Sequence, residues 1–309
     1  MMFEEQYIDM KFEEQYIEML ESLLDEGVRV PSRTGIDTLA NFDYRLVVEC
    51  GEFPFSTVRP CPLSMAFKEF WFFLNGKTQT KELEEQGIKF WKGNTTREFL
   101  DNRGLYYLPE GDMGKAYGSQ LRAYGATTTE EKRLVKDQLR ETYETLRDDR
   151  YSRRVYNTMW NPNESHLMAL TPCWHSHQFV VLPDGKGKDV LHLKLINRSL
   201  DSVFGAIFAV QQYRLYQMCM AKLLGYEVGV LSCDLTHVHV YFNQIEYAEE
   251  ILDREFYFEK DSYDIDRIKI KKELNTLEDL LSMEWGDFEI KYPTVNNEEF
   301  ETPRPPMAV

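Results

Sequence analysis

The stretch from residue 177 to residue 242 most constrains the fold, because strand-like and helix-like patterns follow one another there without a linker. The runs "HQFVVL" (177–182) and "VLHLKLI" (190–196) are typical of strands, and the "PDGKGK" between them carries the Asp-Gly of a hairpin turn. A long helix is predicted over 208–225, and "VHVYF" (238–242) alternates like another strand. This mixture predicts a single α+β domain with flanking helices.

Further elements are predicted on the N-terminal side of this stretch. Apolar spacing predicts a helix from about residue 12 to 26 that ends at Gly27, and a dense apolar helix in "FKEFWFFLNG" (67–76). Residues 129–149 have the spacing of a solvated amphipathic helix, and "RRVYNTMW" (153–160) is strand-like.

The hexapeptide "FEEQYI" occurs twice, at 3–8 and at 12–17. The shift of nine residues turns an α-helix by about 900°, so the two copies would face opposite sides. The repeat therefore cannot extend one packing stripe. We predict that residues 1–11 form an N-terminal extension and that residues 12–309 form the single folded domain.

Charge and cysteine usage narrow the classes of function. The net charge of −16 repels polyanions, so nucleic-acid binding is not expected, and a small phosphate would need a local cluster of arginines. No run of about 18 apolar residues predicts a membrane span, and the acidic start does not resemble a signal peptide. Five cysteines without a C-x-x-C pair predict a reducing cytoplasm, in a cell or, for a virus-encoded protein, in its host.

The segment "LTPCWHSHQF" (170–179) leaves three interpretations of Cys173 open. Cys173, His175 and His177 alternate, so on a strand all three side chains would point the same way, as metal ligands could. No second cluster with ligand spacing supports a metal site. The thiol could instead be a core residue at the start of a strand, or a nucleophile whose thiolate is stabilised by positive charge.

Arginines next to hydroxyl residues favour the nucleophile. Arg33 lies in "PSRTG", Arg198 precedes Ser199, and Arg153 and Arg154 stand in tandem after a serine. Guanidinium and hydroxyl groups both donate hydrogen bonds to phosphate oxygens. Their combination in so acidic a chain predicts a phosphate-binding site.

The order of these pieces resembles thymidylate synthase and its relatives, the pyrimidine nucleotide hydroxymethylases, from about residue 12 to residue 309. The motifs that carry the resemblance are "SRTG" (32–35), "EFWFFLNG" (69–76), "FW" (90–91), "GKAYGSQLRAYG" (114–125), "SRRVYNTMWNP" (152–162), "TPCWHSHQF" (171–179), "NRSLDSVFG" (197–205), "HVYFN" (239–243) and a terminal "MAV". The resemblance implies that family's single-domain fold, a mixed sheet with flanking helices, and a homodimer formed through the sheet.

The resemblance also implies the roles of individual residues. It makes Cys173 the nucleophile that adds to C6 of a pyrimidine, with Glu69 and Tyr117 as the other catalytic residues. The implied substrate-binding residues are Arg33, Arg198 and Ser199 for the phosphate, Arg153 and Arg154 reaching into the partner's site, His239 and Tyr241 for the sugar 3′-hydroxyl, and position 209 for the base. The implied folate-binding residues are Trp91, Leu170, Asp201, Gly205, Phe208 and Ala308 of the closing tail. Methylenetetrahydrofolate is the implied co-substrate, without a metal.

Three positions depart from the methylating members. Ala209 stands where they have an asparagine whose amide matches O4 and N3–H of uracil, and alanine offers neither a donor nor an acceptor. Trp174 replaces a histidine after the nucleophile, and Val58 replaces a lysine expected to meet the folate tail. These departures favour a (deoxy)cytidylate-type 5-hydroxymethylase, in which water attacks the exocyclic methylene. A divergent thymidylate synthase acting on dUMP is the alternative, and a non-catalytic nucleotide-binding relative represents another class.

Overall fold

The computed structural model describes residues 10–125, 135–254, 262–295 and 299–305. The α-helices are α1 (Phe12–Glu26), α2 (Leu63–Leu74), α3 (Lys81–Glu84), α4 (Arg97–Asn102), α5 (Gly118–Ala123), α6 (Gln138–Asp148), α7 (Ala206–Leu224), α8 (Ile245–Asp253) and α9 (Leu277–Leu281). The strands are β1 (Val28–Val30), β2 (Thr38–Val48), β3 (Tyr156–Thr158), β4 (Trp174–Pro183), β5 (Asp189–Asn197), β6 (Leu200–Asp201), β7 (Glu227–Tyr241), β8 (Ile268–Ile270) and β9 (Phe288–Ile290).

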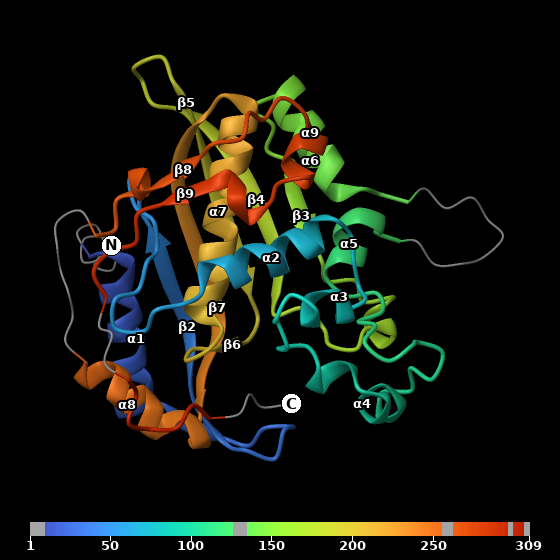
Figure 1. The fold of residues 1–309 in the computed structure, drawn as a ribbon, viewed down its shortest axis with the longest axis vertical. Coiled ribbons are helices and arrows are strands. Elements are labelled where there is room, and N and C mark those ends of the chain that lie inside the picture. The colour runs from blue at the N-terminus through green and yellow to red at the C-terminus, as the bar shows by residue number, and fades with distance from the viewer. Residues whose placement is uncertain (1–9, 126–134, 255–261, 296–298, 306–309) are drawn as a thin grey trace.

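Within the described chain, seven strands form one mixed sheet in the order β1-β2-β7-β5-β4-β3, with β6 paired to β7 (Figure 1). Strands β4 and β5 form the predicted hairpin, whose Asp184 side chain accepts hydrogen bonds from the backbone N–H groups of Lys186 and Lys188. Strand β5 runs parallel to β7, and the long α7 lies between them in the chain. This crossover confirms the predicted α+β class with a mixed sheet.

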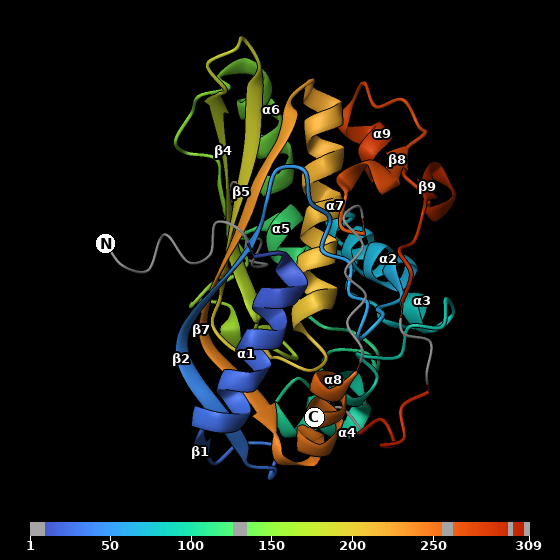
Figure 2. The same ribbon diagram turned by 90° about the vertical axis from the view of Figure 1, so that its left-hand side faces the viewer.

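Helices α1, α2 and α7 lie on the same side of the sheet (Figure 2). Helix α7 is buried along most of its length, because its methionines and tyrosines pack into the core. Its Arg214 is fully buried and donates to the carbonyl oxygens of Glu49, Cys50, Glu52 and Gly229 and to the side chain of Gln217. These bonds satisfy a charged group that would otherwise be costly to bury.

The predicted helix ending at Gly27 is confirmed, but other boundaries were wrong. Helix α2 begins at Leu63 rather than residue 67, and β7 begins at Glu227, well before the predicted residue 238. Helix α6 begins only at residue 138, because Asp137 caps it by accepting the N–H of Arg140. Residues 129–134 of the predicted helix lie outside the described residues.

Residues 1–9, with the first "FEEQYI" copy, also lie outside the described residues, so the N-terminal extension stays a prediction. The second copy is part of α1, where Phe12, Glu13 and Tyr16 are buried. None of the described helices could cross a membrane, since none is both long and apolar enough.

Candidate active site

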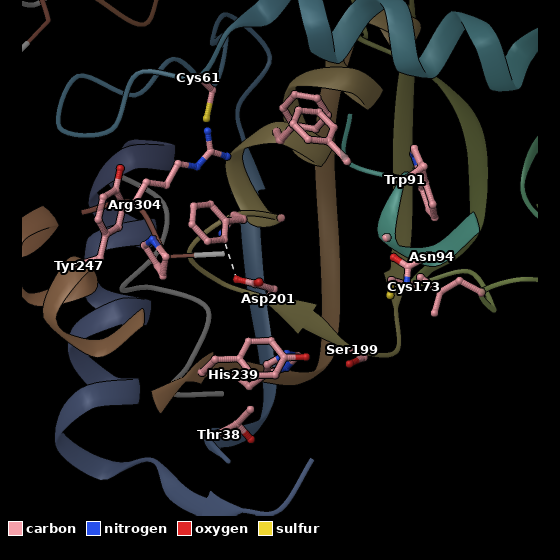
Figure 3. Close-up of a pocket in the computed structure, with 18 of the residues that line it drawn as sticks. Thr38, Cys61, Trp91, Asn94, Cys173, Ser199, Asp201, His239, Tyr247 and Arg304 are labelled. Carbon is pink, nitrogen blue, oxygen red and sulfur yellow. Dashed lines mark hydrogen bonds between the residues drawn. The ribbon is translucent and has the colours of Figure 1, made fainter. Parts of the chain in front are cut away.

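A cavity of about 1000 Å³ gathers most of the residues that the sequence predicts for the site (Figure 3). The predicted residues that line it are Arg33, Glu69, Trp91, Leu170, Cys173, Arg198, Ser199, Asp201, Gly205, Phe208, His239 and Tyr241. They come from α2, from α7, from the strands of the sheet and from the loops between these elements. The apolar side chains of this set are available to a flat aromatic ligand, and the arginines to an anion.

Cys173 lies immediately before β4 and is held through its backbone. Its N–H donates to the phenol oxygen of Tyr117 at 3.0 Å, and its carbonyl oxygen accepts the N–H of Arg198 at 3.1 Å. Its Sγ lies 3.9 Å from Nη2 of Arg198. The Arg198 guanidinium also donates to the carbonyl oxygens of Pro172 and Thr171, so it is fixed beside the thiol.

Burial raises the pKa of the Cys173 thiol, and this outweighs the lowering by the charges of Arg198 and Arg33. Within one chain, the two arginines thus only partly offset the effect of burial on this pKa. The resemblance also implies guanidinium groups from a partner chain, whose positive charge would lower the pKa further.

The predicted common orientation of Cys173, His175 and His177 is also wrong. A β-bulge between Trp174 and Ser176 shifts the register of β4, and His177 points into the core, where its ring packs on Tyr213 and Tyr216. Burial lowers the pKa of His177 to about 3, so its ring is neutral. In the described ranges, no group of three or more His, Cys, Asp or Glu side chains is arranged to hold a metal ion.

Glu69 of α2 presents a buried carboxyl group to the cavity. One oxygen accepts the indole N–H of Trp91 at 2.6 Å, and the other accepts the side-chain amide of Gln212 at 2.5 Å. Burial raises the pKa of Glu69 to about 7, although both hydrogen bonds lower it. A carboxyl group with this pKa can give or take a proton near neutral pH.

Asp201 and His239 face the cavity from adjacent strands, β6 and β7. Asp201 accepts the N–H groups of Val203 and Phe204 on one oxygen and the amide of Gln244 on the other, so its carboxylate is rigidly held. Burial lowers the pKa of His239 to about 4, so its ring is neutral and offers one hydrogen-bond donor and one hydrogen-bond acceptor.

Arg153 and Arg154 are not brought to this cavity. They lie in an exposed loop before β3 and line a separate surface hollow with Asp149, Tyr151 and Ser152. Within one chain, the site therefore contains Arg33 and Arg198 but not this tandem pair.

The three departures from the resemblance have distinct structural settings. Ala209 is buried on α7 and is not among the lining residues, so its predicted substrate contact is not seen. Val58 is buried in the core, and Trp174 packs near Tyr213 with ring centroids 6.3 Å apart. The residue after Val58, Arg59, does line the cavity and donates to the Cys61 sulfur at 3.1 Å.

Residues that the sequence did not single out also take part. Asn94 and His237 line the cavity, and each has a buried side-chain nitrogen with no hydrogen-bond partner among the described residues. Arg304 and Pro305 line it as well, with the Arg304 guanidinium 4.8 Å from the Phe204 ring centroid. No local pattern indicated Asn94, Arg304 or Pro305 as site residues, and His237 drew attention only as a possible metal ligand. The predicted tail residue Ala308 lies outside the described residues.

Comparison with known proteins identifies the family that this geometry suggests. The family model described as "Thymidylate synthase" matches residues 14–299. The chain is 33% identical to the thymidylate synthase of Saccharomyces cerevisiae over 299 residues, which cover 93% of this chain and 92% of the relative. It is 34% identical to the Ascaris suum thymidylate synthase over 76% of this chain and 81% of the relative, and 33% identical to the human one over 76% and 75%. The chain therefore belongs to the thymidylate synthase family.

Proposed function

We propose that this chain transfers the one-carbon unit of methylenetetrahydrofolate to C5 of dUMP and so catalyses the thymidylate synthase reaction. The observation that carries the proposal is the cavity in which the Cys173 sulfur lies 3.9 Å from a fixed Arg198 guanidinium and shares the lining with Glu69 and Asp201. The expected preference for a hydroxymethylase is not supported, because the relatives at 33% and 34% identity are named thymidylate synthases. The reaction belongs to pyrimidine nucleotide biosynthesis.

Each group at the cavity suits a step of this chemistry. The Cys173 thiolate adds to C6 of the pyrimidine, which makes C5 a carbon nucleophile toward the one-carbon unit. Glu69, with a pKa of about 7, is suited to relay protons at the base. We assign the phosphate to Arg33, Arg198 and Ser199.

The other predicted site residues are assigned to the sugar and to the folate. His239 and Tyr241 are proposed to bind the sugar hydroxyl. Trp91, Leu170, Gly205 and Phe208 are proposed to form the folate wall, with Asp201 fixing the folate ring through its rigid carboxylate.

A homodimer would supply the missing positive charge. On β5, Ile196 and Lys194 alternate with the buried Leu193 and Leu195, so they lie on the sheet face that points away from the core. Lys194 pairs there with Asp234, and this face of apolar and ionic side chains is suited to a second copy of the chain. We propose that Arg153 and Arg154 of each subunit reach the site of the other and lower the pKa of Cys173 there. All five cysteines are free thiols, which supports the proposal that the protein works in the cytoplasm.

Product analysis tests the proposed reaction. The protein is incubated with methylenetetrahydrofolate and, separately, with dUMP, dCMP and CMP. Dihydrofolate and a 5-methyl product from dUMP are expected. Tetrahydrofolate with a 5-hydroxymethyl product would instead show that water, not hydride, quenches the exocyclic methylene.

Trapping tests the nucleophile. A 5-fluoropyrimidine nucleotide with the folate co-substrate is expected to leave an adduct on the peptide that contains Cys173, detected by mass spectrometry. The Cys173→Ser variant should bind nucleotide but form no adduct. An adduct on another residue, or none on the parent protein, would refute the assignment.

A further inference from the structure

Gln212 contacts the candidate site from the side opposite to the cavity. It lies on α7, is buried, and donates its side-chain amide to Glu69 on α2 at 2.5 Å, across 143 positions of sequence. Glu69 lines the cavity, whereas Gln212 is not among the lining residues. The amide therefore reaches the carboxyl group from the core side.

Gln212 does not take over the base recognition that an asparagine would provide at position 209. Gln212 and Ala209 are three positions apart on α7, so they share one face of the helix and the amide stands one turn further along. The amide is engaged by the Glu69 oxygen rather than offered to a ligand. The neighbouring Gln211 points elsewhere and donates to the carbonyl oxygen of Pro54 at 2.9 Å.

We propose that Gln212 is a positioning residue for Glu69, and that its amide fixes the orientation of the carboxyl group and favours its ionised form. Trp91 holds the other oxygen at 2.6 Å, so the carboxyl group is clamped at both ends. Rotation of the carboxyl group would break both bonds at once. The proposed proton-transfer role of Glu69 rests on the proposed function, but the clamp itself does not.

The hydrogen bond from Gln212 affects the pKa of Glu69, because two opposing effects act on that carboxyl group. Burial favours the neutral acid, and the two donated hydrogen bonds, which both lower the pKa, oppose it. Burial raises the pKa of two other cavity groups, Tyr117 and Cys173. Charged side chains also line the cavity, namely Arg33, Arg59, Lys89, Arg198, Asp201 and Arg304. Burial and the two hydrogen bonds are nevertheless what shift the pKa of Glu69.

Substitution of Gln212 by methionine tests the proposal, because methionine has a similar length but no donor. Gln211→Met is the matched control, since it removes a side-chain amide from the adjacent position of the same helix without touching Glu69. Gln212→Ser serves as a second variant, because its shorter side chain removes the direct bond without adding apolar bulk. Titration of ¹³C-labelled glutamate side chains by NMR, with the Glu69 signal assigned by its loss in Glu69→Gln, measures the pKa without turnover.

Removal of the Gln212 amide is expected to raise the pKa of Glu69 by about one unit or more, the effect of deleting a hydrogen bond to a charged group. If dUMP is the substrate, the acidic limb of the pH profile of kcat should move to higher pH by the same number of pH units as the pKa of Glu69. The affinity for the nucleotide should change little. Gln211→Met should leave the Glu69 titration unchanged. An identical Glu69 titration in parent and Gln212 variants would overturn the proposal. Absence of dUMP turnover in the parent would refute only the proposed function.

Discussion

The phenol oxygen of Tyr117 accepts the backbone N–H of Cys173 at 3.0 Å, although 56 positions of sequence separate the two residues. Tyr117 is the residue before α5 and has a φ of 37°, a conformation that is strained for a side chain of this size. Its ring stacks on Phe73 of α2 with centroids 4.8 Å apart. Packing thus holds a strained residue in place, and its hydroxyl group fixes the backbone of Cys173, the proposed nucleophile.

Tyr117→Phe is expected to lower kcat about tenfold, since it removes one buried hydrogen bond but keeps the ring stack. Nucleotide binding should change less than kcat, because the hydroxyl group positions Cys173 rather than contacting the phosphate. Steady-state kinetics and nucleotide titration measure both quantities. Tyr106→Phe, at an exposed tyrosine, is the control. An unchanged kcat would show that the hydroxyl group does not position the nucleophile.

The spacing of apolar residues predicted the helices and strands that bury one regular face against the core. Helix α1 and the β4–β5 hairpin were found this way, since their apolar spacing and turn residues are read within a few positions. The N-terminal part of β7 was missed. It is central in the sheet, paired with both β2 and β5, and that pairing cannot be seen in a single stretch of sequence.

The sequence predicted which residues belong to the candidate site, but it did not predict how these residues contact one another. The family motifs identify Cys173 and Arg198, and both line the cavity. The β4 bulge that separates the orientations of Cys173 and His177 depends on register, which local sequence does not determine. The Gln212–Glu69 bond joins two helices that only the tertiary fold brings together.

The carboxyl group of Glu69 should make the protein less stable as pH rises. Its pKa is about 7 in the folded chain and near the ordinary value of 4.5 when unfolded, so between these values only the unfolded state releases the proton. The contribution of Glu69 to the free energy of unfolding therefore falls progressively between these two pH values. Above pH 7 it is lower by about 3 kcal/mol than at acidic pH. Urea unfolding of the parent and of Glu69→Gln at several pH values measures the effect. The difference in unfolding free energy should shift in favour of the variant between pH 4.5 and 7; a difference independent of pH would contradict the assignment.

Ala209→Asn should sharpen recognition of uracil. The substitution returns an amide, with one donor and one acceptor face, to the position where the resemblance implies base recognition. The kcat/KM ratio for dUMP over dCMP is expected to rise about five- to a hundredfold, corresponding to one matched hydrogen-bonding group. The control is Ala209→Leu, which adds similar bulk without polar atoms. An equal ratio in both variants would mean that position 209 does not read the base.

Glu13→Gln should destabilise the whole domain. The buried Glu13 carboxylate accepts five hydrogen bonds, from Ser56 Oγ, Thr57 N and Oγ1, Val58 N and the Tyr263 hydroxyl. A glutamine would turn an NH₂ group toward some of these donors, so the free energy of unfolding should fall by about 3 kcal/mol or more. Urea denaturation measures the loss, and Glu18→Gln on the exposed face of the same helix is the control. Because the bonded segment leads directly to Arg59, which lines the cavity, the proposed folate binding should also weaken.

Mixed dimers test whether Arg153 and Arg154 act across an interface. A Cys173→Ser chain and a chain with Arg153→Ala and Arg154→Ala should each be inactive alone. After unfolding and refolding an equal mixture, half of the dimers are hybrids with one complete site each, so about a quarter of the parent activity should return. Refolding each variant alone is the control and should return none. The rescued sites should also react with a thiol reagent at lower pH than the arginine variant does, because the partner's guanidinium groups favour the thiolate. A mixture that stays inactive would show that the two arginines serve their own chain instead.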